Sequence, residues 1–280
     1  QDTPGVRVTF LADLVVPKEL RGLMAANFVS RKEDGNVAVE TWEMDHPIPS
    51  YLTAFAIGDV VSRDLSDRVR IWAEPELIES AASEFEDLPI IVVAAEELFG
   101  PYPWGRYDAL FMPTAFPFGG MENQGLTFFS PSIVAGDKSM VSVAAHELAH
   151  SWFGNLVTNA TWEDFWLNEG WTMWAENRLV EAVFGIDAAN LGRAIMDGEV
   201  QKDIERFIEN GTPELTHLKW NLTGIDPDDA FSRVPYQKGV RFLEAIEATV
   251  GREAFDAFAK SYIHAFRFST ITTKEFIEFL

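Results

Sequence analysis

The stretch AAHELAHSWFGN, residues 144–155, constrains the fold most, because it places two of the five histidines one helical turn apart. On a helix, His146 and His150 stand on one face, with Glu147 about 100° round from His146. Two imidazole nitrogens at this spacing can share one metal ion, and Glu147 can then reach a water on that ion. Two partly buried histidines bonded to the backbone would give the same spacing. This helix alone therefore leaves both interpretations open.

Local signals set the limits of this helix. Ser139 is a predicted N-cap, and Gly154 is a predicted C-terminal terminator. The next predicted helix, TWEDFWLNEGWTMWAENRL, begins with a capping pattern at Thr161–Asp164 and runs for about six turns. The two helices are expected to form a hairpin, so that residues on the second helix fold back towards the first.

The second helix supplies a candidate third metal ligand. Glu169 and Glu176 lie on one face of it, among residues that are otherwise largely apolar. An acid on an apolar face is costly to bury unless it is paired or bound to a metal. Glu169 lies nineteen positions after His150, a good distance for a hairpin to bring it back. A surface acid of the second helix is the alternative interpretation.

Composition narrows the chemistry. The chain has no cysteine, so disulfides and thiolate zinc sites are excluded, and any metal needs histidine and carboxylate ligands. The absence of cysteine also suits a cytoplasmic location. A formal net charge of −22 speaks against nucleic acid or an anionic membrane as a partner. The longest apolar run, Ile90 to Ala95, is far too short for a transmembrane segment.

Hydrophobic periodicity predicts an α+β chain. Apolar residues alternate from Val6 to Val16, which is the pattern of a strand. Strands are predicted at Val6–Val16, Val37–Met44, Tyr51–Val61, Val69–Ala73, Tyr107–Met112 and Leu126–Val134, and helices at Glu76–Glu86, at Pro89–Phe99 and predominantly from Ser139 onward. Residues 1–62 are therefore β-rich, and a domain boundary is predicted near residue 63. The opening QDTPGVRVTF and the closing TTKEFIEFL carry no terminal signals, so we expect an internal fragment of a longer protein.

Several motifs together resemble a known family. The H-E-x-x-H motif, followed by eighteen residues and a glutamate within WLNEGWT, resembles the gluzincin zinc aminopeptidases of the alanyl and membrane aminopeptidase type. PFGGMENQGLTF, residues 117–128, is similar to the G-x-M-E-N motif of that family, and VPYQKG, residues 234–239, to its tyrosine segment. Within the family, QDTP, VPKEL, AGDKS, GNLVTN and DPD also resemble the leukotriene A(4) hydrolase subgroup. These motifs recur in order along nearly the whole chain.

The resemblance implies a set of site residues. His146, His150 and Glu169 would hold one zinc ion, with Glu176 orienting a ligand histidine from behind. Glu147 would be the general base, and Tyr236 would hydrogen-bond the oxyanion. The segment GGMEN would bind the substrate, with a carboxylate that pairs with a free α-ammonium and two glycines that let the backbone approach closely. Its residues are Gly119, Gly120, Met121, Glu122 and Asn123. The neighbouring strand, Leu126 to Phe129, is expected to receive the peptide by edge addition.

The resemblance also implies the architecture. Residues 1–62 would be the tail of an N-terminal β-domain, and residues 63–280 a thermolysin-like catalytic domain. The rest of the β-domain and a C-terminal helical domain would then be missing, and both are expected to complete the substrate site. The implied activity is a zinc aminopeptidase that acts on peptides with a free N-terminus. A gluzincin endopeptidase, or a zinc-bearing binding domain without turnover, are the alternatives.

One departure from the subgroup limits the expected activity. In DPDDAFSRVPY the acid of the subgroup is present as Asp228, but Phe231 stands where a further tyrosine is expected. Phenylalanine keeps the ring and loses the hydroxyl, so it neither donates a proton nor holds a water. We therefore expect peptide hydrolysis without efficient epoxide hydrolysis.

Overall fold

The structure is a computed structural model that describes residues 3–280, so Gln1 and Asp2 of the QDTP motif lie outside the described residues. It contains both helices and strands, which confirms the predicted α+β class. The chain forms two compact units. The first contains residues 6–93 and 102–151, and the second contains residues 3–5, 94–101 and 152–280. The boundary near residue 63 stays a prediction.

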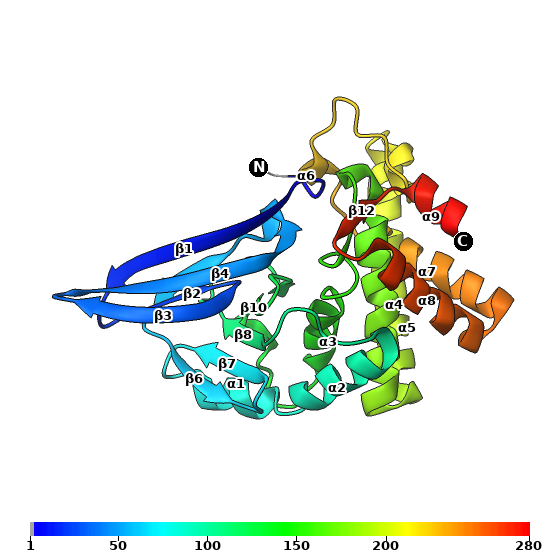
Figure 1. Cartoon of the computed structure of the whole chain (residues 1–280). Helices are drawn as coiled ribbons and strands as arrows, with labels where there is room; N and C mark the ends of the chain where they lie inside the picture. The colour runs from blue at the N-terminus through cyan, green and yellow to red at the C-terminus, as the bar shows by residue number, and fades with distance from the viewer. Residues whose placement is uncertain (1–2) are drawn as a thin grey trace. The chain divides into compact units, whose positions relative to one another are not determined.

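The first unit is built on β-sheets (Figure 1). One antiparallel sheet has the order β1 (Arg7–Pro17), β4 (Val37–Pro49), β3 (Asn27–Asp34), and a second pair joins β2 (Arg21–Met24) to β5 (Phe55–Gly58). A five-stranded sheet has the order β6 (Val61–Asp64), β7 (Val69–Ala73), β8 (Tyr107–Phe111), β10 (Leu126–Phe129), β9 (Gly120–Met121). Its three central strands are parallel, and both outer strands are antiparallel to their neighbours.

Short helices complete the first unit. The 3-10 turns η1 (Ser50–Leu52) and η2 (Pro131–Ile133) follow β4 and β10, and α1 (Ile78–Glu84) follows β7. Helix α2 (Leu88–Phe99) begins in the first unit and ends in the second, and α3 (Val141–Ala149) carries His146, with His150 as its C-cap residue. Pro89 lies in the first turn of α2, as predicted, where a missing N–H costs nothing.

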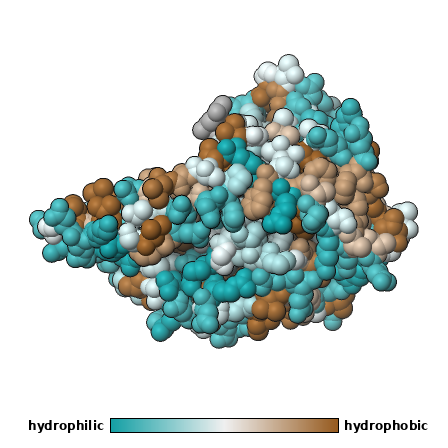
Figure 2. Space-filling view, in the orientation of Figure 1, coloured by the Kyte–Doolittle hydropathy of each residue, from teal (hydrophilic) through white to brown (hydrophobic). Residues whose placement is uncertain are grey.

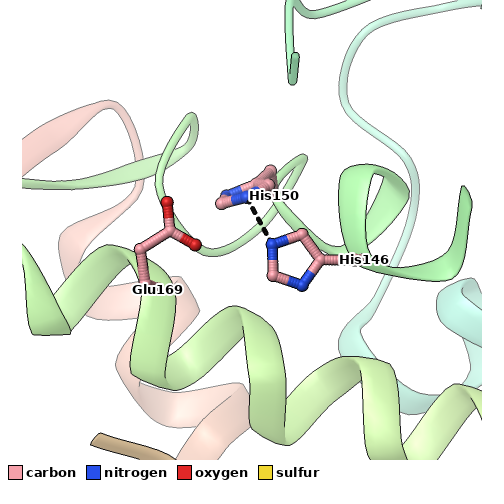
Figure 3. Close-up of side chains that lie close together, drawn as sticks. All are labelled: His146, His150 and Glu169. Atoms are coloured by element: carbon pink, nitrogen blue, oxygen red, sulfur yellow. Dashed lines mark hydrogen bonds between the residues drawn. The ribbon is translucent and has the colours of Figure 1, made fainter. Parts of the chain in front are cut away.

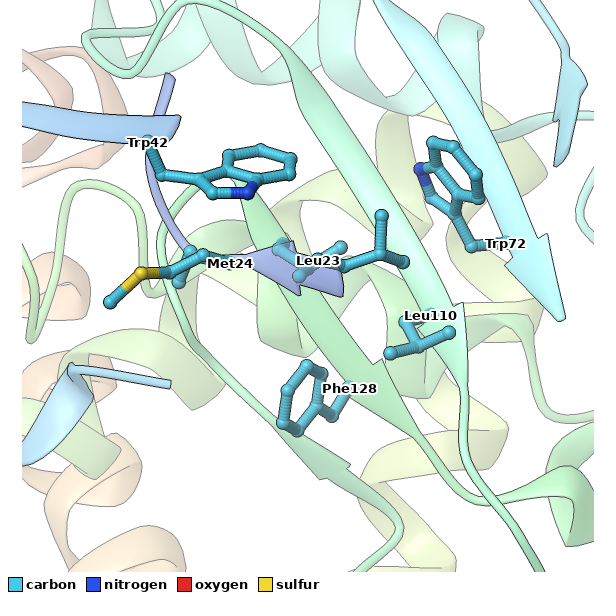
Figure 4. Close-up of a cluster of buried hydrophobic side chains, with 8 residues drawn as sticks. Leu23, Met24, Trp42, Trp72, Leu110 and Phe128 are labelled. Atoms are coloured by element: carbon cyan, nitrogen blue, oxygen red, sulfur yellow. The ribbon is translucent and has the colours of Figure 1, made fainter. Parts of the chain in front are cut away.

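The core of the first unit joins several strands that are distant in the sequence. Its buried side chains come from β2, β4, β7, β8 and β10, and they pack as one cluster (Figure 4). The members are Leu23, Met24, Ala25, Trp42, Trp72, Leu110, Leu126 and Phe128. The cluster anchors β10, the strand that follows the GGMEN segment and pairs with β9. Apolar side chains of β1 such as Leu11 and Val15 are exposed. Figure 2 shows hydrophobic patches interspersed with hydrophilic ones on the face in view.

The second unit is mainly helical. It contains β11 (Val157–Asn159), η3 (Trp162–Asp164), α4 (Trp166–Phe184), α5 (Ile186–Glu209), η4 (Pro213–Thr216), α6 (Pro227–Ala230), α7 (Val234–Val250), α8 (Arg252–Phe266), β12 (Ser269–Ile271) and α9 (Thr273–Phe279). Strands β11 and β12 pair in parallel. Trp171 of α4 is fully buried, and its indole stacks on Phe153, Phe255 and Tyr262 at centroid distances of 5.0–5.6 Å. None of the described helices is long and apolar enough to cross a bilayer.

Several predicted boundaries are wrong for local reasons. The strand predicted at Tyr51–Val61 is divided into η1, β5 and the start of β6. The strand predicted at Leu126–Val134 ends at Phe129, because Pro131 lacks the N–H that a ladder needs and starts a 3-10 turn instead. Strands β2 and β3 were not predicted.

Three predicted helix limits are also wrong. Ser139 is not the N-cap of α3; Met140 takes that place, and the Ser139 amide donates to Asp137 at 3.0 Å. The Thr161–Asp164 pattern does not begin α4 but forms η3, with the Thr161 hydroxyl 2.9 Å from the Asp164 carboxylate. Helix α4 begins at Trp166 and continues to Phe184, so it has the length of the predicted stretch but lies five residues further along the chain. Gly154 has a φ of 115° but lies beyond the end of α3 at Ala149.

Candidate active site

The two histidines of α3 lie with their ring nitrogens facing each other. The Nε2 atoms of His146 and His150 are 3.2 Å apart, as the dashed line in Figure 3 marks, and the ring centroids are 4.8 Å apart. Two ligands that are each about 2.05 Å from one zinc ion, at an angle of about 100°, lie about 3.1–3.2 Å from each other. Both histidines offer nitrogen, a ligand that zinc accepts readily. The pair therefore fits a shared metal ion.

Helix α3 is held at its start by a carboxylate from a distant helix. Glu84 of α1 is buried, and it accepts hydrogen bonds from the backbone N–H groups of Gly136 at 2.9 Å and Lys138 at 2.8 Å. Lys138 has a φ of 60°, and its ammonium group contacts Glu86 and Asp87 at 2.7 and 2.8 Å. The AGDKS loop thus replaces the predicted Ser139 cap. The loop thereby fixes the direction of the α3 axis at its N-terminus.

Glu147, the predicted general base, lies close to His150 and to Glu122. Glu147 is buried on α3, and one ligand atom from each of Glu122, Glu147 and His150 lies within 4.8 Å of the other two. Glu122 and His150 are also buried. Two carboxylates this close in a buried place repel each other unless a cation or a proton lies between them. The cluster therefore favours a positively charged group, such as a metal ion or an ammonium.

The GGMEN segment forms the outer strand of the five-stranded sheet. In it, β9 pairs with β10 through Met121 and Gly120, and the Gly119 carbonyl accepts a 2.9 Å hydrogen bond from the Ser130 N–H. The prediction that Leu126–Phe129 receives a peptide is wrong, because β10 is flanked by β8 and β9. Among the described strands, β9 is one of the two edge strands of this sheet, opposite β6, so strand addition is expected at β9 instead.

The five residues of this segment have different surroundings. The Met121 side chain packs against the buried cluster of Figure 4. Glu122 is buried and reaches towards α3, as its distance to Glu147 shows. The Asn123 side chain is buried, and its backbone N–H donates to the Met121 carbonyl at 2.9 Å. Gly120 lies directly against the Glu147 side chain.

One residue of this site was not predicted from the sequence. The Tyr51 hydroxyl of η1 lies 3.4 Å from Oε1 of Glu122, although the two residues are 71 positions apart. Burial lowers the pKa of the neighbouring Arg7 to about 10, while the charge interaction with Tyr51 acts in the opposite direction. The sequence contains no local signal for this pairing, because it joins residues that are far apart in the chain.

The second unit holds the remaining predicted residues. Glu169 is buried in the first turn of α4, and Glu176 is half-buried two turns further along the same helix. Figure 3 draws Glu169 as a stick on this helix. Burial of an acid in a helix this apolar is consistent with a role as a ligand or as a partner of a charged group.

Tyr236 lies in the first turn of α7 and is half-buried. Its ring contacts Phe165 and Phe231 edge-on, at centroid distances of 6.1 and 6.3 Å. Phe231, at the end of α6, is 53% exposed and also contacts Phe165 at 6.4 Å. The three aromatic rings therefore pack against one another, and among them only Tyr236 carries a hydroxyl group.

The chain is similar to several known proteins over nearly its whole length. The chain is 44% identical to mouse (Mus musculus) aminopeptidase B, covering 99% of this chain and 42% of that protein. It is also 44% identical to Xenopus laevis leukotriene A-4 hydrolase, covering 100% of this chain and 46% of that protein. The structure of native yeast LTA4 hydrolase superposes with a TM-score of 0.92 at 37% identity, over 99% of this chain and 44% of that chain.

A more distant structure has the same fold. An M1 zinc metallopeptidase from Deinococcus radiodurans superposes with a TM-score of 0.78 at 23% identity, over 99% of this chain and 60% of that chain. The chain spans less than half the length of the curated relatives named above. Residues 84–280, which include α3, α4 and α7, match the family described as the peptidase family M1 domain. The chain therefore belongs to peptidase family M1, the gluzincin family that its motifs resemble.

Proposed function

We propose that this protein is a zinc aminopeptidase that removes the N-terminal residue of peptides with a free N-terminus. The observation that carries the proposal is the cluster at the end of α3 and just after β9. There, the histidine nitrogens are 3.2 Å apart, and Glu122, Glu147 and His150 lie within 4.8 Å of one another. Metal ligands, a base and an acid for the substrate amine are thus available in one place.

His146, His150 and Glu169 would hold one zinc ion per chain. The separation of the two imidazoles fits this metal, and the burial of Glu169 with its spacing in the sequence supports it as the third ligand. The bound zinc supplies Lewis acidity to the scissile carbonyl and to water. Glu176 would orient a ligand histidine through an interaction on the side of the ring away from the metal.

The chain's own residues carry the proton transfers. The Glu147 carboxylate takes a proton from the attacking water and passes it to the leaving amine, a step that typically supplies 10²–10⁴-fold in rate. The Tyr236 hydroxyl donates a hydrogen bond to the oxyanion, where a preorganised donor has its largest effect. Phe165 and Phe231 keep the tyrosine ring in place.

Substrate binding would use β9 and its neighbours. The Glu122 carboxylate pairs with the substrate α-ammonium, and Tyr51 steadies that carboxylate from 3.4 Å away. The free edge of β9 at Gly120 binds the substrate backbone. Because the chain spans 42–46% of its curated relatives, we also propose that residues outside 1–280 contribute further substrate contacts.

The test compares a free aminoacyl amide with its N-acetylated form, in the protein and in Glu122→Gln. We expect zinc in a ratio of about one, and cleavage of the free amine at least about 30-fold more efficient, since truncating a buried charge pair costs about 2–5 kcal/mol. Glu122→Gln should lose most of this preference and keep its zinc.

The alternatives give different results. An endopeptidase cleaves the acetylated substrate as well as the free one, and a zinc-bearing binding domain cleaves neither. Either outcome in a folded, zinc-loaded protein contradicts the proposal. If Glu122→Gln cleaves both substrates at the parent's rates, the proposed role of Glu122 is contradicted, but the aminopeptidase activity is not.

A further inference from the structure

Helices α4 and α7 cross at two glycines. A Cβ atom added to Gly170 would lie 2.8 Å from the Cα of Gly239, and one added to Gly239 would lie 2.7 Å from the Cα of Gly170. Carbon atoms that are not bonded to each other do not approach this closely. The two backbones therefore touch, with the Pro235 carbonyl 3.4 Å from the position of a Gly170 Cβ.

Backbone conformation does not explain these two glycines. Among the described residues, the glycines with positive φ do not include Gly170 or Gly239, and both lie inside helices. Glycine destabilises a helix interior relative to alanine, so a glycine there needs another reason. The reason in this structure is the close approach of the two helices.

The crossing lies next to residues of the proposed site. Gly170 directly follows Glu169 in WLNEGW, and Gly239 lies three positions after Tyr236 in VPYQKG. Pro235, whose carbonyl lies against Gly170, directly precedes Tyr236. The glycine contact therefore sets how close the first turn of α7 comes to α4.

The tyrosine ring depends on the same contact. It packs edge-on against Phe165, the residue just before α4, at a centroid distance of 6.1 Å. A side chain at either glycine requires α7 to move from α4 by several tenths of an ångström or more, because ordinary carbon contacts begin near 3.4 Å. Tyr236 would move with α7, while Phe165 stays with α4.

We propose that Gly170 and Gly239 are positioning residues that fix the Tyr236 hydroxyl relative to α4, with Phe165 as the second support, and so set the rate of peptide hydrolysis. The proposal rests on the function proposed above. A misplacement of about 1 Å in a reacting group can cost about 100-fold in rate. The effect should appear in kcat, because the substrate amine is bound by Glu122 and not by Tyr236.

The experiment uses Gly239→Ala and Gly170→Ala, each alone and combined with Tyr236→Phe. Gly192→Ala is the control, because Gly192 lies inside α5 and its added Cβ meets nothing within 4 Å. We expect each glycine variant to lose about 10- to 100-fold in kcat, with KM within about twofold and zinc content unchanged. In the Tyr236→Phe background the same changes should cost less than about threefold, because the hydroxyl that they misplace is already absent.

Phe165→Leu keeps the proposal testable if a glycine variant does not fold. It removes the ring against which Tyr236 packs, and we expect a loss in kcat that again disappears in the Tyr236→Phe background. Full kcat in the folded glycine variants, or equal losses with and without the tyrosine hydroxyl, would overturn the proposal. A failure of the proposed function would show in the parent and in Gly192→Ala, whereas a failure of this inference shows only in the variants at the crossing.

Discussion

Gly120 of β9 and Glu147 of α3 lie in direct contact: a Cβ atom on Gly120 would overlap the Glu147 side chain at its Cγ, Cδ and Oε1 atoms. The outer strand of the sheet and the helix of the two histidines are therefore placed against each other at this point. The proposed general base points at the strand edge where the substrate backbone is expected. Only glycine permits that approach.

We predict that Gly120→Ala lowers kcat by at least about tenfold, because the added methyl group displaces the Glu147 carboxylate from its position. Zinc content should be unchanged, since the histidines lie on the same helix and are not touched. Gly119→Ala is the matched steric comparison for stability, because its Cβ would lie 3.9 Å from Val143, an ordinary contact. Thermal unfolding should show a larger decrease in Tm for Gly120→Ala than for Gly119→Ala. Equal kcat in Gly120→Ala and the parent would contradict the prediction.

Glu147→Gln should keep the metal and lose nearly all turnover. The amide preserves the size of the side chain but does not accept a proton, and general-base steps typically supply 10²–10⁴-fold. The measurement is kcat on an aminoacyl amide, together with zinc content by elemental analysis. Turnover within about threefold of the parent would assign the base to another residue.

Removal of one imidazole should release the metal. We expect His150→Ala to retain well under half of the parent's zinc after dialysis, because two ligands bind zinc much more weakly than three. Glu169→Gln should also lower the zinc content after dialysis. Glu176→Gln, which changes a residue proposed to act only through a ligand, should lower the affinity by about 10–100-fold at most. A full zinc complement in His150→Ala would exclude this ligand set.

The sequence predicted the elements whose signal is local. The i, i+4 spacing of His146 and His150 predicted one helix for both, and the structure has that helix at Val141–Ala149, with His150 as its C-cap residue. The alternation from Val6 predicted β1 within one residue at each end. Strand β3 was not predicted because it is largely polar, and its pairing with β4 rather than its own pattern makes it a strand.

Interactions between distant residues explain the wrong caps. Ser139 had the right residue type for an N-cap, but Glu84, more than fifty positions earlier, binds the amides of that loop instead. Asp164 likewise accepts hydrogen bonds from the Thr273 amide at 2.9 Å and hydroxyl at 2.7 Å, over 109 positions. The contact of Tyr51 with Glu122 belongs to the same class. Such pairs follow from the fold and leave no trace in a short window of sequence.

The pH dependence of stability should reveal the half-buried carboxyl of Asp108 on β8. Burial raises its pKa above the ordinary range, although Trp72 at 3.0 Å and Arg106 at 3.3 Å both donate to it and act in the opposite direction. A raised pKa in the folded state means that the folded protein holds this proton more tightly than the unfolded chain does. The contribution of Asp108 to stability is therefore most favourable at low pH. It falls as the pH rises from about 4, the ordinary pKa of aspartate, through the raised folded value.

Comparison with Asp108→Asn isolates this contribution. The free energy of unfolding of the parent, minus that of the variant, should decrease with rising pH across this window and then level off. Urea unfolding at several pH values measures the difference, and groups common to both proteins cancel. A difference that increases with pH would mean that the folded state lowers the pKa of this carboxyl.

The last prediction concerns Phe231 and the lipid epoxide. Its ring lies 6.3 Å from that of Tyr236 and is half-exposed, so the position lies beside the proposed oxyanion donor and is reached by solvent. A tyrosine there would add a second hydroxyl next to Tyr236. Phenylalanine adds none, and it neither donates a proton nor orients a water. We therefore expect the protein to hydrolyse peptides but to form little dihydroxy acid from the leukotriene epoxide.

Product analysis with the epoxide, beside Phe231→Tyr, tests this expectation. The variant should form the dihydroxy acid at least about tenfold faster than the parent, the size of effect expected for a single positioned proton donor. Peptide hydrolysis should change by less than about threefold, because Glu147, Tyr236 and the zinc ligands are unaltered. The two reactions share the metal, so the peptide rate also reports that the variant is folded and loaded. Efficient dihydroxy acid formation by the parent would show that water reaches the epoxide without a hydroxyl at position 231.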